Sequence, residues 1–133
     1  SVAAYCAPKS LQGRVLKPEE LLEHRLLMLE DGQRQWLSWT DWFADADADY
    51  YTPRHALRTN SYQLLMQSAV MGHGVALGWK RLLAAELDSG RLQMALPHTM
   101  HSRGRLHLMQ PHHRNPPSAA RSFRQWLLAH VGA

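Results

Sequence analysis

The sequence predicts an α/β fold with a mixed or mostly parallel β-sheet. Segments with strand patterns alternate with segments of helical spacing along the whole chain, an order typical of sheets covered by helices. The length of 133 residues suits one domain, since a chain of this size buries roughly two thirds of its unfolded surface. With 45% hydrophobic and 20% charged residues, the composition is that of a globular protein and excludes disordered and collagen-like classes.

Short apolar runs bounded by turn residues predict the strands. The first is the apolar and aromatic run Val2–Cys6, which Pro8 closes. Alternation of Leu92, Met94 and Leu96 with intervening residues predicts a half-buried strand. The other expected strands are Leu26–Leu29, Trp36–Ser38, His55–Thr59, Val75–Leu77 and Leu106–Met109. A turn at Glu30–Gly32 could join the first two of these as a hairpin.

Spacing of three and four residues between apolar side chains predicts the helices. Pro18, followed by two glutamates, indicates the start of a short helix, and Asn60-Ser61 are capping residues in front of the clearest one. That helix ends at Gly72-His73-Gly74. The remaining helical stripes are Trp39, Trp42 and Phe43; Leu82, Leu83, Glu86 and Leu87; and a tail stripe of Ala119, Phe123, Trp126, Leu127, His130 and Val131.

Charge and cysteine content restrict the setting of the protein. The net charge of +4 is spread along the chain and does not by itself indicate nucleic-acid binding. The single cysteine, Cys6, excludes an internal disulfide, so we expect a reducing, cytoplasmic compartment. No apolar run is long enough to span a bilayer. No secretory leader is visible at Ser1, and we expect further protein upstream of it.

The sequence carries no recognisable catalytic or metal-binding pattern, and we expect neither an enzyme nor a cofactor. His98 and His101, and the pair His112-His113, lack the spacing of a metal site. The run Asp45–Asp49 copies the first ligands of a calcium loop but lacks the glycine and glutamate that such a loop needs. Cys6 has no cationic neighbour, so a buried structural thiol is favoured over a nucleophile.

Two features could bind a small molecule. The helix start at Asn60-Ser61 presents unpaired backbone amides that suit a carboxylate or phosphate, although plain capping is favoured as the sole role of these residues. The tryptophans Trp36, Trp39 and Trp42 could stack on a ligand, whereas aromatic residues at helical spacing more often fill a core.

The order of three motifs identifies a resemblance that covers Val2 to Val131. The motifs are K-P-E-E-L-L-x-H-R-L-L-x-L from Lys17, N-S-Y-x-L-x-M-Q-x-A-V-x-G-H-G-V-A-L-G-W from Asn60, and L-L-A-A-E-L-x-S-G-R-L from Leu82. Together they resemble the effector-binding (substrate-binding) domain of LysR-type transcriptional regulators, most closely the subgroup of the glycine-cleavage activator.

This resemblance implies a type-2 periplasmic-binding-protein-like fold of two lobes joined by crossovers. It implies that residues 1–7 cross over from the first lobe, that residues 8–75 form a complete second lobe, and that residues 76–133 return to the first lobe. Compared with the family, the sequence lacks the winged helix-turn-helix, the linker helix and the opening half of the first lobe. An isolated chain is therefore expected to self-associate or to have an unsettled C-terminal third.

The resemblance also implies the function. We expect a domain that binds a small-molecule effector between two lobes and controls DNA binding by an N-terminal domain, within a dimer or tetramer and without a membrane partner. The positions that match segments bordering the cleft are Thr59, Asn60, Ser61, Gly74, Val75 and Trp79, with Trp39 as a weaker candidate. The alternative is a solute-binding protein of the same bilobed fold, which an upstream secretory leader would favour.

Overall fold

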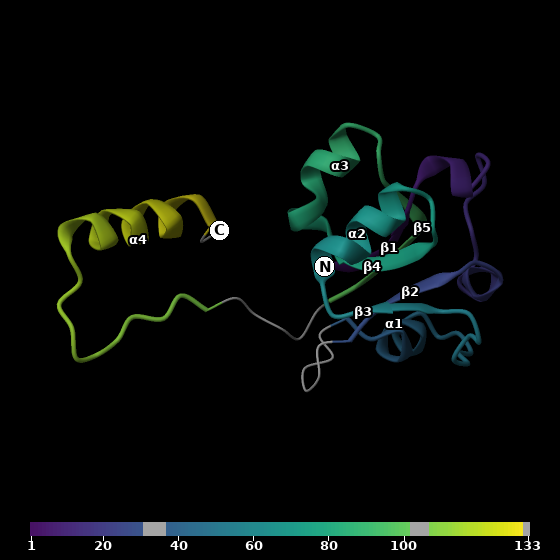
Figure 1. The fold of residues 1–133 in the computed structure, drawn as a ribbon, viewed down its shortest axis with the longest axis horizontal. Coiled ribbons are helices and arrows are strands. Elements are labelled where there is room, and N and C mark those ends of the chain that lie inside the picture. Colours follow the sequence, from purple (N-terminus) through teal and green to yellow (C-terminus); the bar gives the residue numbers. More distant parts are fainter. Residues whose placement is uncertain (31–36, 102–106, 132–133) are drawn as a thin grey trace.

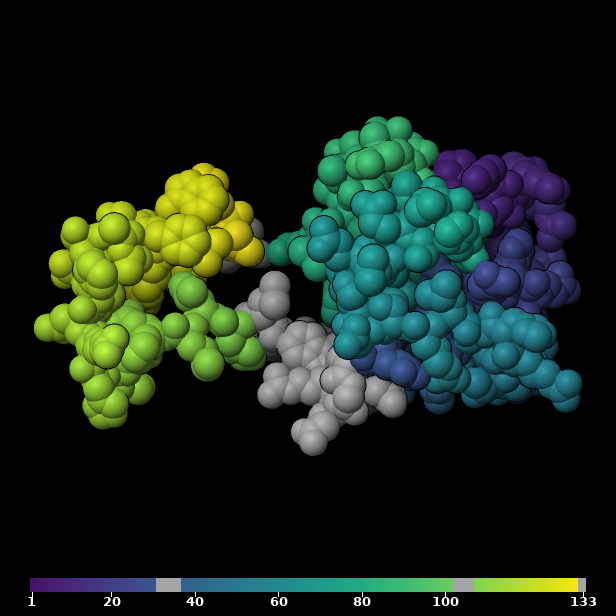
Figure 2. All heavy atoms as spheres, viewed as in Figure 1, coloured from purple at the N-terminus to yellow at the C-terminus, as the bar shows by residue number. Residues whose placement is uncertain are grey.

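The computed structural model describes residues 1–30, 37–101 and 107–131. The described residues between 2 and 100 form a sheet covered by helices on both faces, which we call the sheet body, and helix α4 (Ser118–Val131) stands apart from it (Figure 1). Figure 2 shows the same separation for the atoms of residues 107–131. The predicted α/β class is confirmed.

The sheet has five strands in the order β3-β2-β4-β1-β5. Strand β2 runs parallel to β3 and β4, whereas β1 runs antiparallel to β4 and β5. The carboxyl ends of β2, β3, β4 and β5 therefore lie at one edge of the sheet, together with the start of β1, and we call this the carboxyl edge. The strands are β1 (Val2–Cys6), β2 (Leu26–Leu29), β3 (Leu57–Thr59), β4 (Val75–Trp79) and β5 (Gln93–Met100).

One face of the sheet is covered by α1 (Trp39–Asp45) and by the 3-10 helix Pro18–Glu23. Helix α1 begins at Ser38, whose Oγ accepts a hydrogen bond from the backbone N–H of Asp41 at 3.4 Å. The rings of Trp39, Trp42 and Phe43 are buried here, and Trp42 packs edge-to-face on the other two. The predicted aromatic packing face is confirmed.

The opposite face is covered by α2 (Tyr62–Val70), the 3-10 helix Lys80–Leu83 and α3 (Ala84–Asp88). Helix α2 begins at Ser61, whose Oγ accepts the backbone N–H of Leu64 at 3.3 Å, and it ends before Gly72, which has a φ of 81°. Its buried side chains, Leu65, Met66 and Ala69, pack in one cluster with residues of β1 and β4. The sequence predicted this helix and its cap.

Strand pairing differs from two sequence expectations. Both neighbours of β2 are parallel strands, so Leu26–Leu29 is not one arm of a hairpin; Leu37 and Ser38 lead into α1, and Trp36 lies outside the described residues. His107–Met109 form no strand, and Leu106 again lies outside the described residues. Four-residue apolar runs predict strands well but do not specify their partners.

The sheet continues across the lobe boundary that the resemblance placed after residue 75. Strand β4 lies between β2 and β1, and β5 pairs with β1, so residues 76–100 complete the sheet that β2 and β3 begin. The physical reason is long-range pairing, because β4 places its hydrogen bonds on both earlier strands. Separation from the sheet occurs only after Met100, toward α4 (Figure 1).

Helix α4 exposes the apolar stripe that the sequence predicted. None of the described residues 118–131 is buried, and Phe123 and Trp126 are 58% and 54% exposed. Their rings stack with that of His130 along one side of the helix. No described helix has the length and apolar character needed to cross a bilayer.

Candidate functional site

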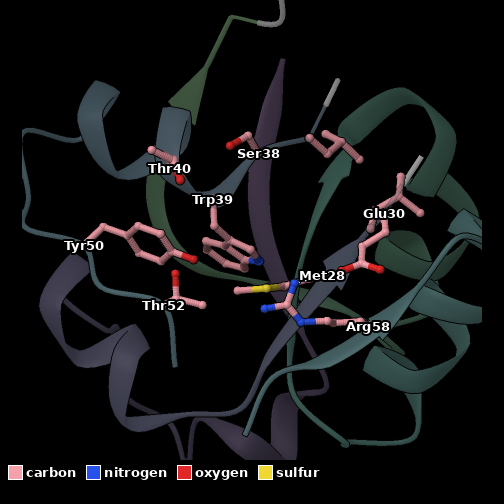
Figure 3. A pocket seen from close by; sticks show the side chains of 10 residues that line it. Met28, Glu30, Ser38, Trp39, Thr40, Tyr50, Thr52 and Arg58 are labelled. Carbon is pink, nitrogen blue, oxygen red and sulfur yellow. Dashed lines mark hydrogen bonds and ion pairs between the residues drawn. The ribbon is translucent and has the colours of Figure 1, made fainter. Parts of the chain in front are cut away.

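A cavity of about 480 Å³ lies at the carboxyl ends of β2 and β3, against the start of α1 (Figure 3). This volume falls within the usual range for small-molecule sites, roughly 300–1,000 Å³. Residues from four stretches of chain line it: Met28, Leu29 and Glu30; Leu37, Ser38, Trp39 and Thr40; Tyr50 and Thr52; and Arg58.

Trp39 forms a fixed apolar floor for this pocket. The side chain is 4% exposed, and its indole Nε1–H donates a hydrogen bond of 3.0 Å to the carbonyl oxygen of Leu27 in β2. Trp39 is the first residue of α1, so the capping by Ser38 that starts the helix also sets the position of the ring. Met28 lies beside it on the same face of the sheet (Figure 3).

Two opposite charges stand together at the rim of the pocket. The guanidinium Nη1 of Arg58 lies 2.8 Å from Oε1 of Glu30, and the two side chains are 50% and 56% exposed. Strand register brings them together, because Met28 pairs with Arg58 and Glu30 follows two residues later on the same face. The backbone also holds this position, since the N–H of Glu30 donates to the carbonyl oxygen of Thr59 at 2.8 Å.

Hydroxyl groups complete the rim. Thr40 and Thr52 are exposed, whereas Tyr50 is half-buried and stacks on Phe43 with ring centroids 5.1 Å apart. The pocket thus combines an apolar floor, several hydroxyls and one charge of each sign. This combination suits a small polar ligand with an apolar part.

Thr59, Asn60 and Ser61 lie at the carboxyl edge, next to the pocket. Thr59 Oγ1 accepts the backbone N–H of Ser61 at 3.1 Å, and Ser61 Oγ caps α2. The side chain of Asn60 is exposed. Both hydroxyls therefore organise the turn that follows β3, as the capping interpretation predicts.

Trp79 also lies at the carboxyl edge, at the end of β4. Its backbone N–H donates to the hydroxyl of Tyr62 at 3.2 Å, and the two rings lie 5.3 Å apart. Burial raises the pKa of Tyr62, the Trp79 N–H lowers it, and the nearby charge of Glu86 raises it, with a net rise above the usual 10.0. At neutral pH Tyr62 is therefore a neutral hydroxyl that ties α2 to β4.

Gly74 and Val75 lie at the opposite edge of the sheet, at the start of β4. Val75 and Trp79 are four residue steps apart along the strand, which corresponds to about 13 Å. The N–H of Val75 donates to the carbonyl oxygen of Arg25 at 2.9 Å, and a Cβ on Gly74 would collide with that same oxygen. The structure thus brings together Thr59, Asn60, Ser61 and Trp79 at one edge, with Trp39 in the pocket beside them, and separates Gly74 and Val75 from this group.

The described residues offer little for catalysis or metal binding. Cys6 is fully buried, and burial raises the pKa of its thiol to about 11, so it is protonated and inert at neutral pH. Asp45 contacts His98, with 2.9 Å between its Oδ2 and the ring Nε2. Within residues 1–30, 37–101 and 107–131, no three His, Cys, Asp or Glu side chains form a group that could hold a metal ion.

Most pocket residues were not predicted from the sequence. Met28, Glu30, Tyr50, Thr52 and Arg58 come from separate segments that only the sheet pairing brings together. One local signal existed: Met28 and Glu30 are two positions apart in an extended segment, and residues with this spacing share a face. Nothing local to either segment indicated that Arg58 would lie opposite them.

Residues 2–132 match the family model described as the LysR substrate binding domain. Among curated proteins, the HTH-type transcriptional regulator PerR of Escherichia coli is 32% identical over 130 residues, which cover 92% of this chain and 40% of PerR. The glycine cleavage system transcriptional activator of Escherichia coli is 27% identical, over 96% of this chain and 41% of the activator. The chain thus spans about two fifths of the length of these relatives.

Solved effector domains share the fold. The effector domain of the transcriptional regulator AmpR of Pseudomonas aeruginosa matches with a TM-score of 0.76 and 26% identity, over 98% of this chain and 61% of that chain. The AmpR effector binding domain of Citrobacter freundii matches with a TM-score of 0.77 and 23% identity, over 98% and 63%. Because 98% of this chain is covered, the likeness includes α4 as well as the sheet body.

Proposed function

The chain belongs to the LysR substrate-binding domain family, and from this premise we propose that it is the effector-sensing part of a transcriptional regulator. Its fold is the type-2 periplasmic-binding-protein-like fold of LysR effector domains. The observation that carries the proposal is the pocket beside Trp39, which lies at the carboxyl edge of a domain matched over residues 2–132. In α/β sheets, ligands bind preferentially outside the carboxyl ends of the strands.

The sheet body acts as one lobe of a two-lobed sensor. The start of β1 and the end of β5 meet at the carboxyl edge, where Val2 pairs with Met100, so both connections to the first lobe leave from the same edge of the sheet as the pocket. Helix α4 belongs to that first lobe, and its exposed apolar stripe supports this placement, because Phe123 and Trp126 would be buried there. An effector held between the lobes would favour the closed arrangement.

The effector contacts come from the carboxyl edge. The pocket supplies Trp39, Arg58 and Glu30, and the turn after β3 supplies the backbone and side chains of Thr59, Asn60 and Ser61, with Trp79 beside them. Gly74 and Val75 support this edge only indirectly, through the pairing of β4 with β2.

Closure of the lobes re-spaces DNA-binding domains in a dimer or tetramer, which couples effector binding to DNA binding. DNA contact belongs to a winged helix-turn-helix outside these 133 residues, and the regulator works in the cytoplasm without a reaction of its own. The relatives named above are transcriptional regulators, which favours this function over a solute-binding protein.

The first test is the coding sequence upstream of Ser1. A winged helix-turn-helix, a linker helix and first-lobe strands are expected there, whereas a secretory leader joined to a bilobed domain would contradict the proposal. The second test screens metabolites for a rise in the melting temperature of the full regulator.

A pocket variant links the second test to the site. Thr52→Val removes a rim hydroxyl with little change of shape, and Thr99→Val in β5 does the same away from the pocket. A genuine effector loses affinity with the first variant and keeps it with the second. Equal responses of both variants would place the effector elsewhere.

A further inference from the structure

The ion pair between Arg58 and Glu30 restricts the charge of any ligand in the pocket beside Trp39. Arg58 carries five N–H donors, and Glu30 accepts one of them through Oε1. The guanidinium can therefore receive a ligand carboxylate while the pair persists, and Glu30 Oε2 can accept hydrogen bonds from an ammonium group. Both charges stand at the same rim, 2.8 Å apart.

A ligand with a single charge fits this rim poorly. A simple carboxylate would bind Arg58 but would lie beside the like charge of Glu30, and a simple amine would meet Arg58 in the same way. A ligand that carries both charges close together satisfies both residues. An α-amino acid is the smallest common molecule of this kind.

The floor of the pocket adds a second requirement. Trp39, Met28 and Leu37 present apolar surface below the charged rim, and burying an apolar side chain there is favourable. Glycine has the two charges but nothing to cover this surface. The tight hydrogen bond of Trp39 to Leu27 keeps the floor in place, so the pocket is formed before a ligand arrives.

We propose that the pocket binds a zwitterionic α-amino acid, or an amino-acid portion of a larger molecule, with its carboxylate on Arg58, its ammonium on Glu30 and an apolar side chain on Trp39. This inference rests on the proposed function, because it gives the chemical class of the effector for the same pocket.

Three probes of similar shape test the charge requirement. L-phenylalanine carries both charges, 3-phenylpropanoate only the carboxylate and 2-phenylethylamine only the ammonium. Binding is followed by NMR at pH 7 through the indole N–H of Trp39, in the 15N-labelled chain carrying Phe123→Glu and Trp126→Glu, which remove the exposed apolar stripe of α4. We expect L-phenylalanine to bind at least about fivefold more tightly than either single-charge probe, and glycine to bind at least about tenfold more weakly than L-phenylalanine.

Two variants separate the roles of the charges. Glu30→Gln should bring 3-phenylpropanoate to the affinity of L-phenylalanine, and Arg58→Gln should do so for 2-phenylethylamine. Both side chains are half-exposed, so both variants should fold, which the dispersion of the NMR spectrum checks. The control is Arg91→Gln, which removes another partly exposed arginine–glutamate pair, 3.5 Å from Glu86, and should change no probe affinity.

Equal binding of the three probes, or no shift of the Trp39 indole with any of them, overturns the amino-acid assignment. So does an equal loss for all probes in Glu30→Gln, since a merely structural pair would act in that way. These results leave the sensing function standing if an effector of another class still raises the melting temperature of the full regulator. Failure of the upstream sequence test would instead remove the sensing function while the probe affinities remained a property of the pocket.

Discussion

Gly74 offers a sharp test of whether β2 and β4 are held together by a close backbone approach. The perturbation is Gly74→Ala, which places a Cβ against the carbonyl oxygen of Arg25 and within 3.1 Å of Leu27 Cδ2. Gly74 does not have a positive φ, so the reason for glycine here is space and not backbone conformation. The matched control is Gly90→Ala, where φ is 73° and nothing lies within 4 Å of the added carbon.

The expected cost follows from the contacts. Moving Arg25 away strains or breaks the 2.9 Å hydrogen bond from the buried N–H of Val75, which costs about 1–3 kcal/mol. Crowding of Leu27 adds about 1–3 kcal/mol, and the reduced freedom of the unfolded chain returns about 0.4–1 kcal/mol. The net loss for Gly74→Ala is therefore about 1–6 kcal/mol. For Gly90→Ala only the left-handed conformation opposes the methyl group, at about 1 kcal/mol.

Equilibrium urea unfolding followed by far-UV circular dichroism measures both values, with the slope of the transition checked for two-state behaviour. A loss below about 1 kcal/mol for Gly74→Ala, or a larger loss for Gly90→Ala than for Gly74→Ala, would refute the close-approach argument.

Three further predictions concern the cap of α2, the buried thiol and α4. Ser61→Ala removes the bond to the N–H of Leu64 and should lower the unfolding free energy by about 1 kcal/mol, measured by urea unfolding; a neutral effect would contradict the capping role. Burial raises the pKa of Cys6 from its ordinary 9.0 to about 11, so its contribution to stability is complete below about pH 9 and is lost as the pH rises through 11. The loss amounts to about 3 kcal/mol at most, and Cys6→Ala should show a shallower decline with pH; an identical decline would exclude the thiol as a cause. The exposed stripe of α4 should make the 133-residue chain self-associate, so light scattering should report a mass above 15.2 kDa that falls in the double variant Phe123→Glu, Trp126→Glu. A monomeric parent chain would be inconsistent with that prediction.

Local patterns were sufficient for most elements of this fold. The run Val2–Cys6 is a strand with those same bounds, and Ser61 is the residue that caps α2. Both features depend on neighbours in sequence: an apolar run closed by a proline, and a hydroxyl three residues before a free N–H. The position of β4 in the sheet, between β2 and β1, could not be predicted from such local patterns. It depended on the partners of β4, which lie about 50 residues earlier on one side and about 70 on the other.

In the candidate site, too, some residues could be predicted from the sequence and others could not. Trp39 was recognised as a residue that could serve a pocket or a core, and the structure shows both, since its ring is buried and still lines the cavity. Arg58 and Glu30 are unremarkable in sequence, 28 residues apart and each among ordinary surface charges. The parallel register of β2 with β3 brings the two side chains together, and this tertiary pairing cannot be read from the spacing of residues in the sequence.

The pairing of Val2 with Met100 has a consequence for how the sheet body can be cut and joined. Cross-strand partners lie roughly 5 Å apart, so a linker of a few residues could connect the start of β1 to the end of β5. Closing so short a loop costs little entropy, and new termini could be opened at the exposed turn around Gly90. Such a circular permutant should retain the strand order. Because its two ends lie close together, the sheet body could also be inserted into a single surface loop of another protein.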